Sequence, residues 1–344
     1  MSISIVIGGQ YGSEGKGKVS YFFSRKLRAS AVVRVGGCNS GHTVVDDVKG
    51  EFVLRILPTA AIDENIASVL PSGSYIDLDI LFREIDKTKI LDNNLKIDPF
   101  AVIIDEQMKA SEIEDDLQGK IGSTLSGTGQ AVIQRLKRTS EIKFAKDYDT
   151  LSKYICDTKA YLRGLLDEGK HVVIEGTQGF GLSPINSTYY PYCTSRDTTA
   201  AGFLMETGMS PFDVENIIMV IRAYPIRVGG NSGPLNNELS WEKVSLDSGA
   251  NIDLTEYTSA TLRKRRVAEF DSDIVIKAIE VNRPNIIIMN HLDYIDYSCN
   301  NSVALSVEIY NFMEKVQNLI NQKINYVGTG KNILITPNGK EVEI

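Results

Sequence analysis

Short runs of apolar, mostly β-branched residues recur along the chain, and segments with the spacing of amphipathic helices lie between them. Runs that are apolar throughout are typical of strands buried on both faces, as in a parallel sheet covered by helices. We therefore predict an α/β fold with a mostly parallel central sheet and helices on both of its faces. The runs that we interpret as buried strands are Ile3–Ile7, Ala31–Val35, His171–Ile174, Ile217–Ile221 and Asn285–Met289.

Four segments between or after these runs have helical periodicity: Val19 to Leu27, Leu151 to Leu166, Ile274 to Ile279 and Ile309 to Ile320. We find no internal repeat, low-complexity tract or linker, and we therefore expect one continuous domain over residues 1–344 with long functional loops. In sheets of this kind, ligands collect at the carboxyl ends of the strands. The loops that follow the strands are therefore the place to look for functional residues.

Composition excludes several classes of protein. The chain has 344 residues, 42% hydrophobic and 24% charged, which is typical of a soluble globular protein. Its net charge of -7 gives no overall positive field, so we expect neither a nucleic-acid partner nor a membrane surface. Four cysteines without a CxxC pair and three histidines disfavour a disulfide scaffold or a structural zinc site. The start, MSISIVIGG, has no basic leader, and no apolar run could span a bilayer, so we expect a cytoplasmic protein.

The first expected strand is followed directly by GGQYGSEGKGK, Gly8 to Lys18, and then by a helical segment. Gly12 to Lys18 fits the GxxxxGK spacing of a P-loop-like phosphate-binding loop, in which backbone N–H groups and a helix N-terminus converge on phosphate oxygens. The Ser or Thr that usually follows the lysine and ligates magnesium is Val19 here. We predict phosphate binding, but not an ordinary nucleotide hydrolase.

Two other strands also end in glycine-rich segments. The second strand leads into VGGCNSGHT, Val35 to Thr43, where His42 lies on a flexible turn and is placed for proton transfer. The third leads into EGTQGFGLS, Glu175 to Ser183, which precedes the hydroxyl-rich Thr188 to Gly202. Such a loop can hydrogen-bond a phosphate or a base without carrying charge. We expect these segments to line a ligand site with the phosphate-binding loop.

Three features are less specific on their own. His171 begins an apolar strand and is interpreted as structural, whereas His291 follows one and can line a ligand site. The basic run Arg263–Arg266 is explained by a solvated face when it is considered alone. The functional interpretation is that this run binds a dicarboxylate or phosphate, because guanidinium groups bind carboxylates through two parallel hydrogen bonds.

Taken together, these segments resemble the adenylosuccinate synthetase family, purine-pathway ligases that join L-aspartate to a 6-oxopurine nucleotide at the expense of a nucleoside triphosphate. The resemblance extends from Gly8 to Lys331, and the chain is closer in length to the short archaeal-type form. The blocks that carry it, in the family's order, are GGQYGSEGKGK, VGGCNSGHT, IGSTLSGTGQ, EGTQG with YPYCTSRDTT, RVGGNSGPL and TSATLRKRR. An ordered set of this kind is far more specific than any single motif.

The resemblance implies roles for individual residues. His42 would be the general acid that assists phosphoryl transfer to the 6-oxo group, and Lys16 would support the transferring phosphate. The implied catalytic set is Ser13, Lys16, His42 and Gln178. The residues implied to bind the nucleoside triphosphate are Gly12, Glu14, Gly15, Lys16, Gly17, Lys18, Gly41, His42, Thr43, Asn290, Asp293, Gly328 and Gly330.

The resemblance also implies a metal ion, a homodimer, and binding sites for the purine monophosphate and for aspartate. Mg2+ would be the cofactor, with Ser13 and the backbone of Gly41 as its protein ligands. Arg138 matches an arginine that the family sends into the neighbouring subunit's site, which implies a homodimer. The residues implied for the purine monophosphate are Ser13, Asn39, Ser123, Thr124, Arg138, Gln178 and Thr194. Those implied for aspartate are Val228, Gly229, Thr258, Ser259, Thr261, Arg263 and Arg265.

Ser13 departs from the ordinary family pattern. The ordinary enzyme has an aspartate there, which ligates magnesium and takes the proton from the purine ring nitrogen beside the 6-oxo carbon. Serine is a poor base at neutral pH and lacks the charge for a metal. Ser13 is the substitution of a viral branch, the 2-aminoadenylosuccinate synthetases, which act on dGMP. The 2-amino group of guanine lies next to that ring nitrogen, and a shorter, neutral hydroxyl leaves room for it.

A second departure lies in MNHLDY, Met289 to Tyr294. Ordinary members have a lysine–x–aspartate pair that selects the guanine of GTP. Here Asp293 remains, but His291 replaces the lysine. Resemblance to the viral branch implies ATP or dATP as the phosphate donor.

The leading hypothesis is therefore a ligase that joins L-aspartate to dGMP with ATP or dATP, through a 6-phosphoryl intermediate, to give succinyl-2-amino-deoxyadenylate for 2-aminoadenine DNA. Such a viral enzyme would act in the host cytoplasm. The alternative within the family is ordinary adenylosuccinate synthesis from IMP, L-aspartate and GTP. A regulatory protein that binds nucleotides without catalysis is an alternative from another class. A nucleic-acid binder is suggested only by Arg135–Arg138 and Arg263–Arg266, against the acidic net charge.

Overall fold

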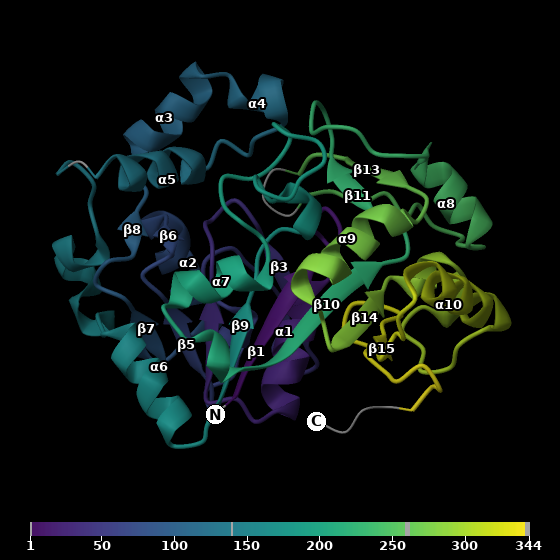
Figure 1. Ribbon diagram of the computed structural model, residues 1–344, viewed down its shortest axis with the longest axis horizontal. Coiled ribbons are helices and arrows are strands. Elements are labelled where there is room, and N and C mark those ends of the chain that lie inside the picture. Colours follow the sequence, from purple (N-terminus) through teal and green to yellow (C-terminus); the bar gives the residue numbers. More distant parts are fainter. Residues whose placement is uncertain (1, 139, 259–261, 341–344) are drawn as a thin grey trace.

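The computed structural model describes residues 2–138, 140–258 and 262–340 (Figure 1). Its centre is an eight-stranded sheet in the order β15-β14-β10-β1-β9-β2-β5-β7, in which every neighbouring pair is parallel. The predicted fold class is confirmed. The strands are β1 (Ser2–Gly8), β2 (Ala31–Arg34), β5 (Ala67–Leu70), β7 (Leu95–Ile97), β9 (His171–Glu175), β10 (Val214–Arg222), β14 (Ile286–Asn290) and β15 (Tyr326–Val327).

All five runs interpreted as buried strands lie in this sheet, as β1, β2, β9, β10 and β14. The sequence analysis missed β5, β7 and β15, which have two to four residues each and lie toward the two edges. Such short strands have too few residues to show a periodicity of their own.

Helices cover both faces of the sheet. Successive residues of each strand point to opposite sides, so a single strand packs against the helices on both faces. On one face, Ile5 of β1 belongs to the same buried cluster as Phe203 and Ile274. On the other face, Val6 packs in a cluster with Phe23 of the first helix. The helices are α1 (Lys16–Lys26), α2 (Leu78–Thr88), α3 (Glu106–Glu114), α4 (Leu117–Ile121), α5 (Thr128–Lys137), α6 (Thr158–Asp167), α7 (Ala200–Thr207), α8 (Trp241–Asp247), α9 (Ser272–Asn282) and α10 (Val307–Ile320) (Figure 1).

Three of the four predicted helices correspond to α1, α9 and α10. The fourth, expected from Leu151 to Leu166, is divided into a 3₁₀ helix at Asp149–Tyr154 and α6. The division has a local cause, since the Asp157 side chain accepts a hydrogen bond from the Ala160 N–H at 3.0 Å and so caps the start of α6. In the described ranges, no helix is both long and apolar enough to cross a membrane.

Three small sheets are added to this core, and two of them carry residues of the predicted site. The hairpin β3 (His42–Asp46) and β4 (Gly50–Leu54) begins at His42. A three-stranded sheet places Val228 directly opposite Arg265 in an antiparallel pair. Its strands are β11 (Ile226–Val228), β13 (Arg265–Ala268) and β12 (Glu238–Leu239), and the third small sheet is β6 (Tyr75–Ile76) with β8 (Val102–Ile103).

Candidate active site

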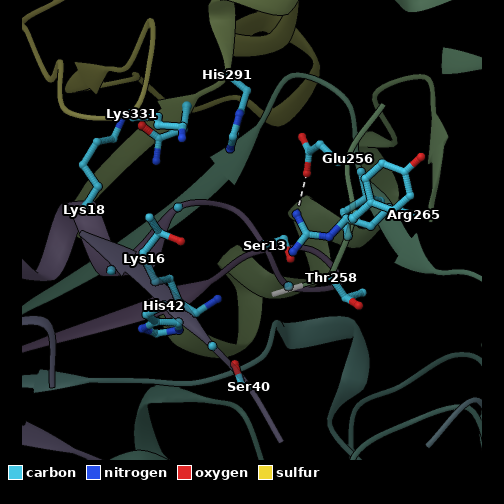
Figure 2. A pocket seen from close by; sticks show the side chains of 18 of the residues that line it. Ser13, Lys16, Lys18, Ser40, His42, Glu256, Thr258, Arg265, His291 and Lys331 are labelled. Carbon is cyan, nitrogen blue, oxygen red and sulfur yellow. Dashed lines mark hydrogen bonds and ion pairs between the residues drawn. The ribbon is translucent and has the colours of Figure 1, made fainter. Parts of the chain in front are cut away.

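Two adjoining cavities, of about 550 and 540 Å3, are lined by loops that follow the strands of the main sheet. The residues common to both linings are Tyr11, Asn39, Thr124, Gln178, Leu182 and Val228. The first cavity, part of which Figure 2 shows, contains most of the residues expected to bind the triphosphate. These are Gly12, Gly15, Lys16, Gly17, Lys18, Gly41, His42, Thr43, Asn290, Asp293 and Gly330.

Ser13, Val228, Thr258 and Arg265 also line the first cavity. The second cavity contains five of the residues expected to bind the purine monophosphate, namely Asn39, Ser123, Thr124, Gln178 and Thr194. The structure therefore brings together residues that are up to about three hundred positions apart in the sequence, around two neighbouring cavities that share part of their lining. Their binding roles remain predictions.

Several expected site residues do not line either cavity. Glu14 and Gly328 are buried, Gly229 and Arg263 are partly buried, and Arg138 is exposed at the end of α5. Ser259 and Thr261, expected to bind aspartate, lie outside the described residues.

The phosphate-binding loop has a conformation that glycine permits, with φ angles of 97° at Gly12 and 90° at Gly15. Glu14 has an internal role in this loop. Its carboxylate accepts hydrogen bonds from the Gly12 N–H at 2.8 Å and the Gln10 N–H at 3.2 Å, and it pairs with Lys16 Nζ at 2.7 Å. The negative charge of Glu14 therefore holds the loop and Lys16 in place. Lys16 is also the first residue of α1, so the positive end of the helix dipole lies at this loop.

The β3–β4 hairpin approaches this loop very closely at Gly17. A Cβ atom at Gly17 would lie 2.7 Å from the Thr43 carbonyl oxygen and 2.9 Å from the Cβ atom of His42. Any larger residue would push the hairpin away from α1. The glycine is therefore what allows His42 and the phosphate-binding loop to share one cavity.

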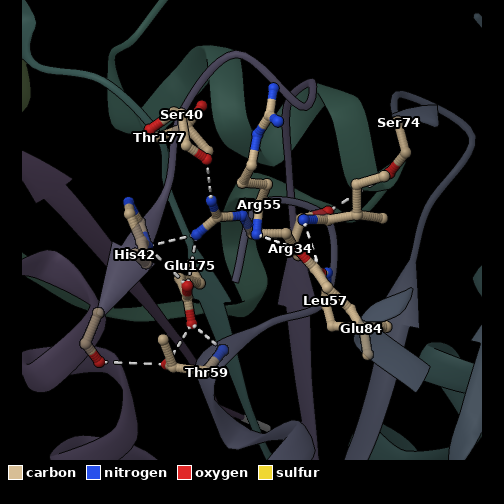
Figure 3. A network of polar contacts seen from close by, with 12 residues as sticks. Arg34, Ser40, His42, Arg55, Leu57, Thr59, Ser74, Glu84, Glu175 and Thr177 are labelled. Carbon is tan, nitrogen blue, oxygen red and sulfur yellow. Dashed lines mark hydrogen bonds and ion pairs between the residues drawn. The ribbon is translucent and has the colours of Figure 1, made fainter. Parts of the chain in front are cut away.

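His42 is held by a buried polar network (Figure 3). Its Nδ1 atom lies 2.7 Å from Oε1 of Glu175, and Arg34 contacts both His42 and Glu175. Glu175 Oε2 accepts hydrogen bonds from the main-chain N–H of Thr59 at 2.9 Å and from its hydroxyl at 2.6 Å. These contacts fix the imidazole ring at the edge of the cavity.

Charge and burial set the protonation of this network. Burial, together with the charge of Arg34, lowers the pKa of His42 to about 3, so that the ring is neutral at pH 7. Burial opposes the ionisation of Glu175, yet Arg34 and His42 lower its pKa to about 2. Glu175 is therefore ionised and can accept a hydrogen bond from the Nδ1–H tautomer of the neutral ring, and Nε2 has no hydrogen-bond partner among the described residues.

Unpaired acceptors mark the other end of the first cavity. Asp293 Oδ2 accepts a hydrogen bond from Asn300 at 2.8 Å, but its Oδ1 atom is buried without a partner in the described part of the chain. Asn290 donates to the Glu14 carbonyl oxygen at 2.8 Å, and its own Oδ1 atom is likewise unpaired. Because unpaired buried acceptors are costly, this end of the cavity favours a ligand with N–H donors.

Lys18 connects this region to the C-terminal part of the chain. Its Nζ atom donates to the carbonyl oxygens of Gly330 at 2.9 Å and Ile333 at 3.1 Å. Burial lowers the pKa of Lys18 to about 8, against the attraction of Asp293. Lys18 therefore anchors the loop after β15 at the cavity, and Lys331 on this loop pairs with Glu51 of β4 at 2.6 Å.

The second cavity offers mainly neutral hydrogen-bonding groups. Asn39 Nδ2 lies 3.4 Å from the Thr194 hydroxyl, and Asn39 Oδ1 has no partner among the described residues. Buried Glu112 accepts the N–H groups of Gly127 and Gly129 at 2.9 and 2.8 Å, and so satisfies the start of α5. Hydroxyls and amides therefore predominate among the polar groups of this lining, together with Arg227, whose Nη1 atom is buried without a partner among the described residues.

Sequence analysis missed four charged residues that organise these cavities: Arg34, Glu175, Arg222 and Glu256. Arg34, Glu175 and Arg222 are the last residues of β2, β9 and β10, which all end at one edge of the sheet. A charged residue that directly ends an apolar strand is a signal that could have found these three. Glu256 lies in a loop and had no such signal.

No group of three or more His, Cys, Asp or Glu side chains suited to a metal ion occurs in residues 2–138, 140–258 and 262–340. Ser13 and Gly41, the residues implied as protein ligands of Mg2+, both line the first cavity and carry a hydroxyl and a carbonyl oxygen. These neutral, hard donors fit a Mg2+ ion that is bound mainly by substrate phosphates and water, as is common for this ion.

Comparison with known proteins relates this chain to a family of purine nucleotide ligases. The model of the adenylosuccinate synthetase family matches residues 5–146 and 140–299. The chain is 33% identical to the adenylosuccinate synthetase of Methanococcus vannielii, with 97% of each chain covered, and 34% identical to that of Methanocaldococcus jannaschii, with 96% and 94% covered. This chain belongs to the adenylosuccinate synthetase family.

Solved structures have the same fold. Fully ligated adenylosuccinate synthetase from Plasmodium falciparum superposes with a TM-score of 0.84 at 20% identity, covering 98% of this chain and 100% of the other. Succinoaminodeoxyadenylate synthetase of cyanophage S-2L, bound to dGMP and to dATP as an energy donor, superposes with a TM-score of 0.80 at 24% identity, covering 97% and 95%. At these identities the likeness is evidence for the fold alone.

Proposed function

We propose that this ligase joins L-aspartate to dGMP at the 6-oxo carbon, with ATP or dATP as phosphate donor, and releases succinyl-2-amino-deoxyadenylate. The observation that carries this proposal is the neutral Ser13 hydroxyl at the cavity, where the ordinary family pattern has an aspartate. A purine with a 2-amino group needs space next to its ring nitrogen, and serine is both shorter than aspartate and uncharged.

The alternative is ordinary adenylosuccinate synthesis from IMP, L-aspartate and GTP. It is supported by the archaeal relatives, which bear that name at 33 to 34% identity over nearly the whole chain. Comparison of whole sequences favours this alternative over the dGMP reaction. The dGMP proposal rests instead on two positions, Ser13 and His291, which both line the first cavity.

In either reaction, the described residues would act in the same way. Lys16 and the start of α1 would bind the transferring phosphate, and His42 would contact the oxygen that receives it. His42 is neutral in the free protein, and the negative charge of bound phosphates would raise its pKa toward the value that a general acid needs. Glu175 would stabilise the imidazolium through Nδ1. Transfer of the γ-phosphoryl group to the 6-oxo oxygen, with loss of the adjacent ring-nitrogen proton to solvent and release of the nucleoside diphosphate, would create a leaving group. The aspartate amine would then displace it as inorganic phosphate and lose a proton.

The donor base would lie at the end of the first cavity where Asp293 Oδ1 is unpaired. An exocyclic amine of the base would donate to this oxygen. His291 is neutral here, because burial and the charge of Arg222 lower its pKa well below the usual value. A neutral imidazole would not favour the guanine carbonyl as a lysine would, which supports an adenine donor.

Mg2+ would be held by the Ser13 hydroxyl, the Gly41 carbonyl and the substrate phosphates, and it would supply charge neutralisation for phosphoryl transfer. A homodimer would complete the purine monophosphate site with Arg138. In support, Arg138 is exposed outside the cavities of its own chain, and the wall of the second cavity carries the exposed apolar side chains of Leu136 and Tyr190.

The test is phosphate release by the purified protein with Mg2+, L-aspartate and ATP, comparing dGMP and IMP in parallel, and repeated with GTP. Turnover that requires dGMP, with a succinylated product identified by mass spectrometry, is expected. Turnover with IMP alone would establish ordinary adenylosuccinate synthesis. Nucleotide binding without any aspartate-dependent phosphate release would instead favour a regulatory protein.

A further inference from the structure

Arg222 is wholly buried at the end of β10, and its guanidinium joins two parts of the first cavity. Its Nη1 atom donates to the carbonyl oxygen of Ser13 at 3.0 Å and to Oε2 of Glu256 at 3.2 Å, and Nη2 pairs with Oε1 of Glu256. Ser13 has a φ of 59°, a left-handed conformation that is unfavourable for a residue with a Cβ atom. Arg222 therefore stabilises the turn that places Ser13 at the cavity.

Glu256 binds a second arginine as well. Its Oε2 atom accepts a hydrogen bond from Nη1 of Arg265 at 2.5 Å, and its carbonyl oxygen accepts the Arg265 N–H at 2.8 Å (Figure 2). Burial raises the pKa of a carboxyl group, but the charges of Arg222 and Arg265 hold the pKa of Glu256 well below its usual range. One ionised carboxylate thus bridges two guanidinium groups.

This contact uses only one side of the Arg265 guanidinium. The Nε atom of Arg265 is buried, and neither Nε nor Nη2 has a hydrogen-bond partner among the described residues. The Nε and Nη2 atoms together form an edge that binds a carboxylate through two parallel hydrogen bonds. Arg265 lines the first cavity opposite Val228 in the β11–β13 pair. This edge therefore has no protein partner among the described residues, and it belongs to an arginine that lines the place where a dicarboxylate is expected.

We propose that Glu256 is a positioning residue for the amino-acid substrate. By holding Nη1 of Arg265, it presents the Nε/Nη2 edge to one carboxylate of that substrate. Through Arg222 it also ties this arginine to Ser13, so that the phosphate-binding loop and the carboxylate-binding arginine form one unit. Two guanidinium groups against one carboxylate leave a net positive charge for the incoming anion. This inference rests on the proposed function as an aspartate ligase.

The test compares Glu256→Gln and Glu256→Asp with the unaltered protein in the phosphate-release assay. Glutamine keeps the size but cannot accept from both arginines, so the KM for L-aspartate should rise about tenfold or more. The KM values of both nucleotides and kcat should change by a smaller factor than the KM for L-aspartate. Glu256→Asp, which keeps the charge, should recover most of the aspartate affinity.

A matched control lies at the opposite end of β10 from Arg222. Asp213 directly precedes β10 and pairs with Arg163 at 2.5 Å, far from the cavity lining. Asp213→Asn removes one carboxylate from an arginine pair, as Glu256→Gln does, and should leave the KM for aspartate unchanged.

Two results would overturn the inference: an unchanged KM for aspartate in Glu256→Gln, or an equal loss for all three substrates that Glu256→Asp fails to recover. If the unaltered protein shows no aspartate-dependent phosphate release, the proposed function fails instead. Calorimetric binding of L-aspartate to the protein with a non-hydrolysable ATP analogue then decides the role of Glu256, since weaker binding by Glu256→Gln is still expected. No aspartate binding to the unaltered protein would contradict both proposals.

Discussion

The Nδ1 atom of His42 and the Oε1 atom of Glu175 lie 2.7 Å apart, although 133 positions separate the two residues in the sequence. The contact exists because β2 and β9 are neighbours in the parallel sheet, so that the loop after one strand meets the last residue of the other. Glu175 has no exposed surface, and it reaches ligands only through the imidazole. It therefore controls the tautomer and orientation of His42.

Replacement of Glu175 by glutamine should lower kcat about 100-fold or more, because the imidazolium would lose its stabilising charge. The KM values should change little. The same variant should lose about 3 kcal/mol or more of unfolding free energy, since Arg34 would remain buried beside a neutral group. Steady-state kinetics and urea unfolding measure both effects. Retention of full kcat would contradict the role of Glu175.

The stability of the free protein should fall as the pH decreases from about 6.5 toward 3. In this window, the unfolded chain binds a proton at His42, but the folded protein, with a pKa of about 3 at this residue, does not. His42→Asn should reduce the slope of unfolding free energy against pH by up to about 1.4 kcal/mol per unit in this window. Equal slopes for the two proteins in urea titrations would show that His42 does not titrate in this way.

Ser13→Asp should decrease turnover of dGMP and confer turnover of IMP. The longer, charged side chain would occupy the space proposed for the 2-amino group and would restore a base beside the ring nitrogen. A competition assay with both nucleotides measures the ratio of their kcat/KM values, which should move by at least about tenfold toward IMP. Unaltered dGMP turnover without any IMP activity would show that Ser13 does not determine which purine nucleotide is used.

His291→Lys should shift donor preference from ATP toward GTP, because it recreates the lysine–x–aspartate pair with Asp293. The shift in relative kcat/KM is expected to be about tenfold. A new lysine next to Arg222 and Lys18 also adds repulsion, so this protein should unfold at a lower temperature. His291→Gln, which is neutral, serves as the control and should keep the original preference.

Arg138→Ala should weaken binding of the purine monophosphate if the residue acts across a dimer interface. Mixing Arg138→Ala with inactive His42→Asn should restore activity, because one site of each mixed dimer would contain both unaltered residues. Random exchange of subunits would give about a quarter of the original activity. No recovery on mixing, with a monomeric mass in solution, would exclude the shared site.

Most of the fold could be predicted from the sequence, because its five central strands are continuous apolar runs. The short edge strands, such as β7 and β15, could not, since two or three residues show no pattern and are held by the neighbouring strand. The break before α6 was missed for a related reason: the apolar spacing continues through it, and only the Asp157 cap marks the start of the helix.

For the candidate site, glycine-rich motifs predicted which loops meet, but not how the charges among them are paired. Glu14 was expected to contact a nucleotide, yet its carboxylate stabilises its own loop. Arg222 and Glu256 were not singled out, because their pairing depends on a distance in space that no sequence spacing encodes. Motifs therefore identified the cavity lining better than the buried charges that support it.

The bonds from Lys18 to Gly330 and Ile333 join positions more than 300 residues apart. On the ribosome, the phosphate-binding loop is made more than 300 residues before the segment that lies against it. A nascent chain that ends before Gly328 would thus have a loop without its nucleotide pocket. Nucleotide binding should therefore begin only after this segment has been made, and the ligand can stabilise chains that contain it but not chains truncated before it.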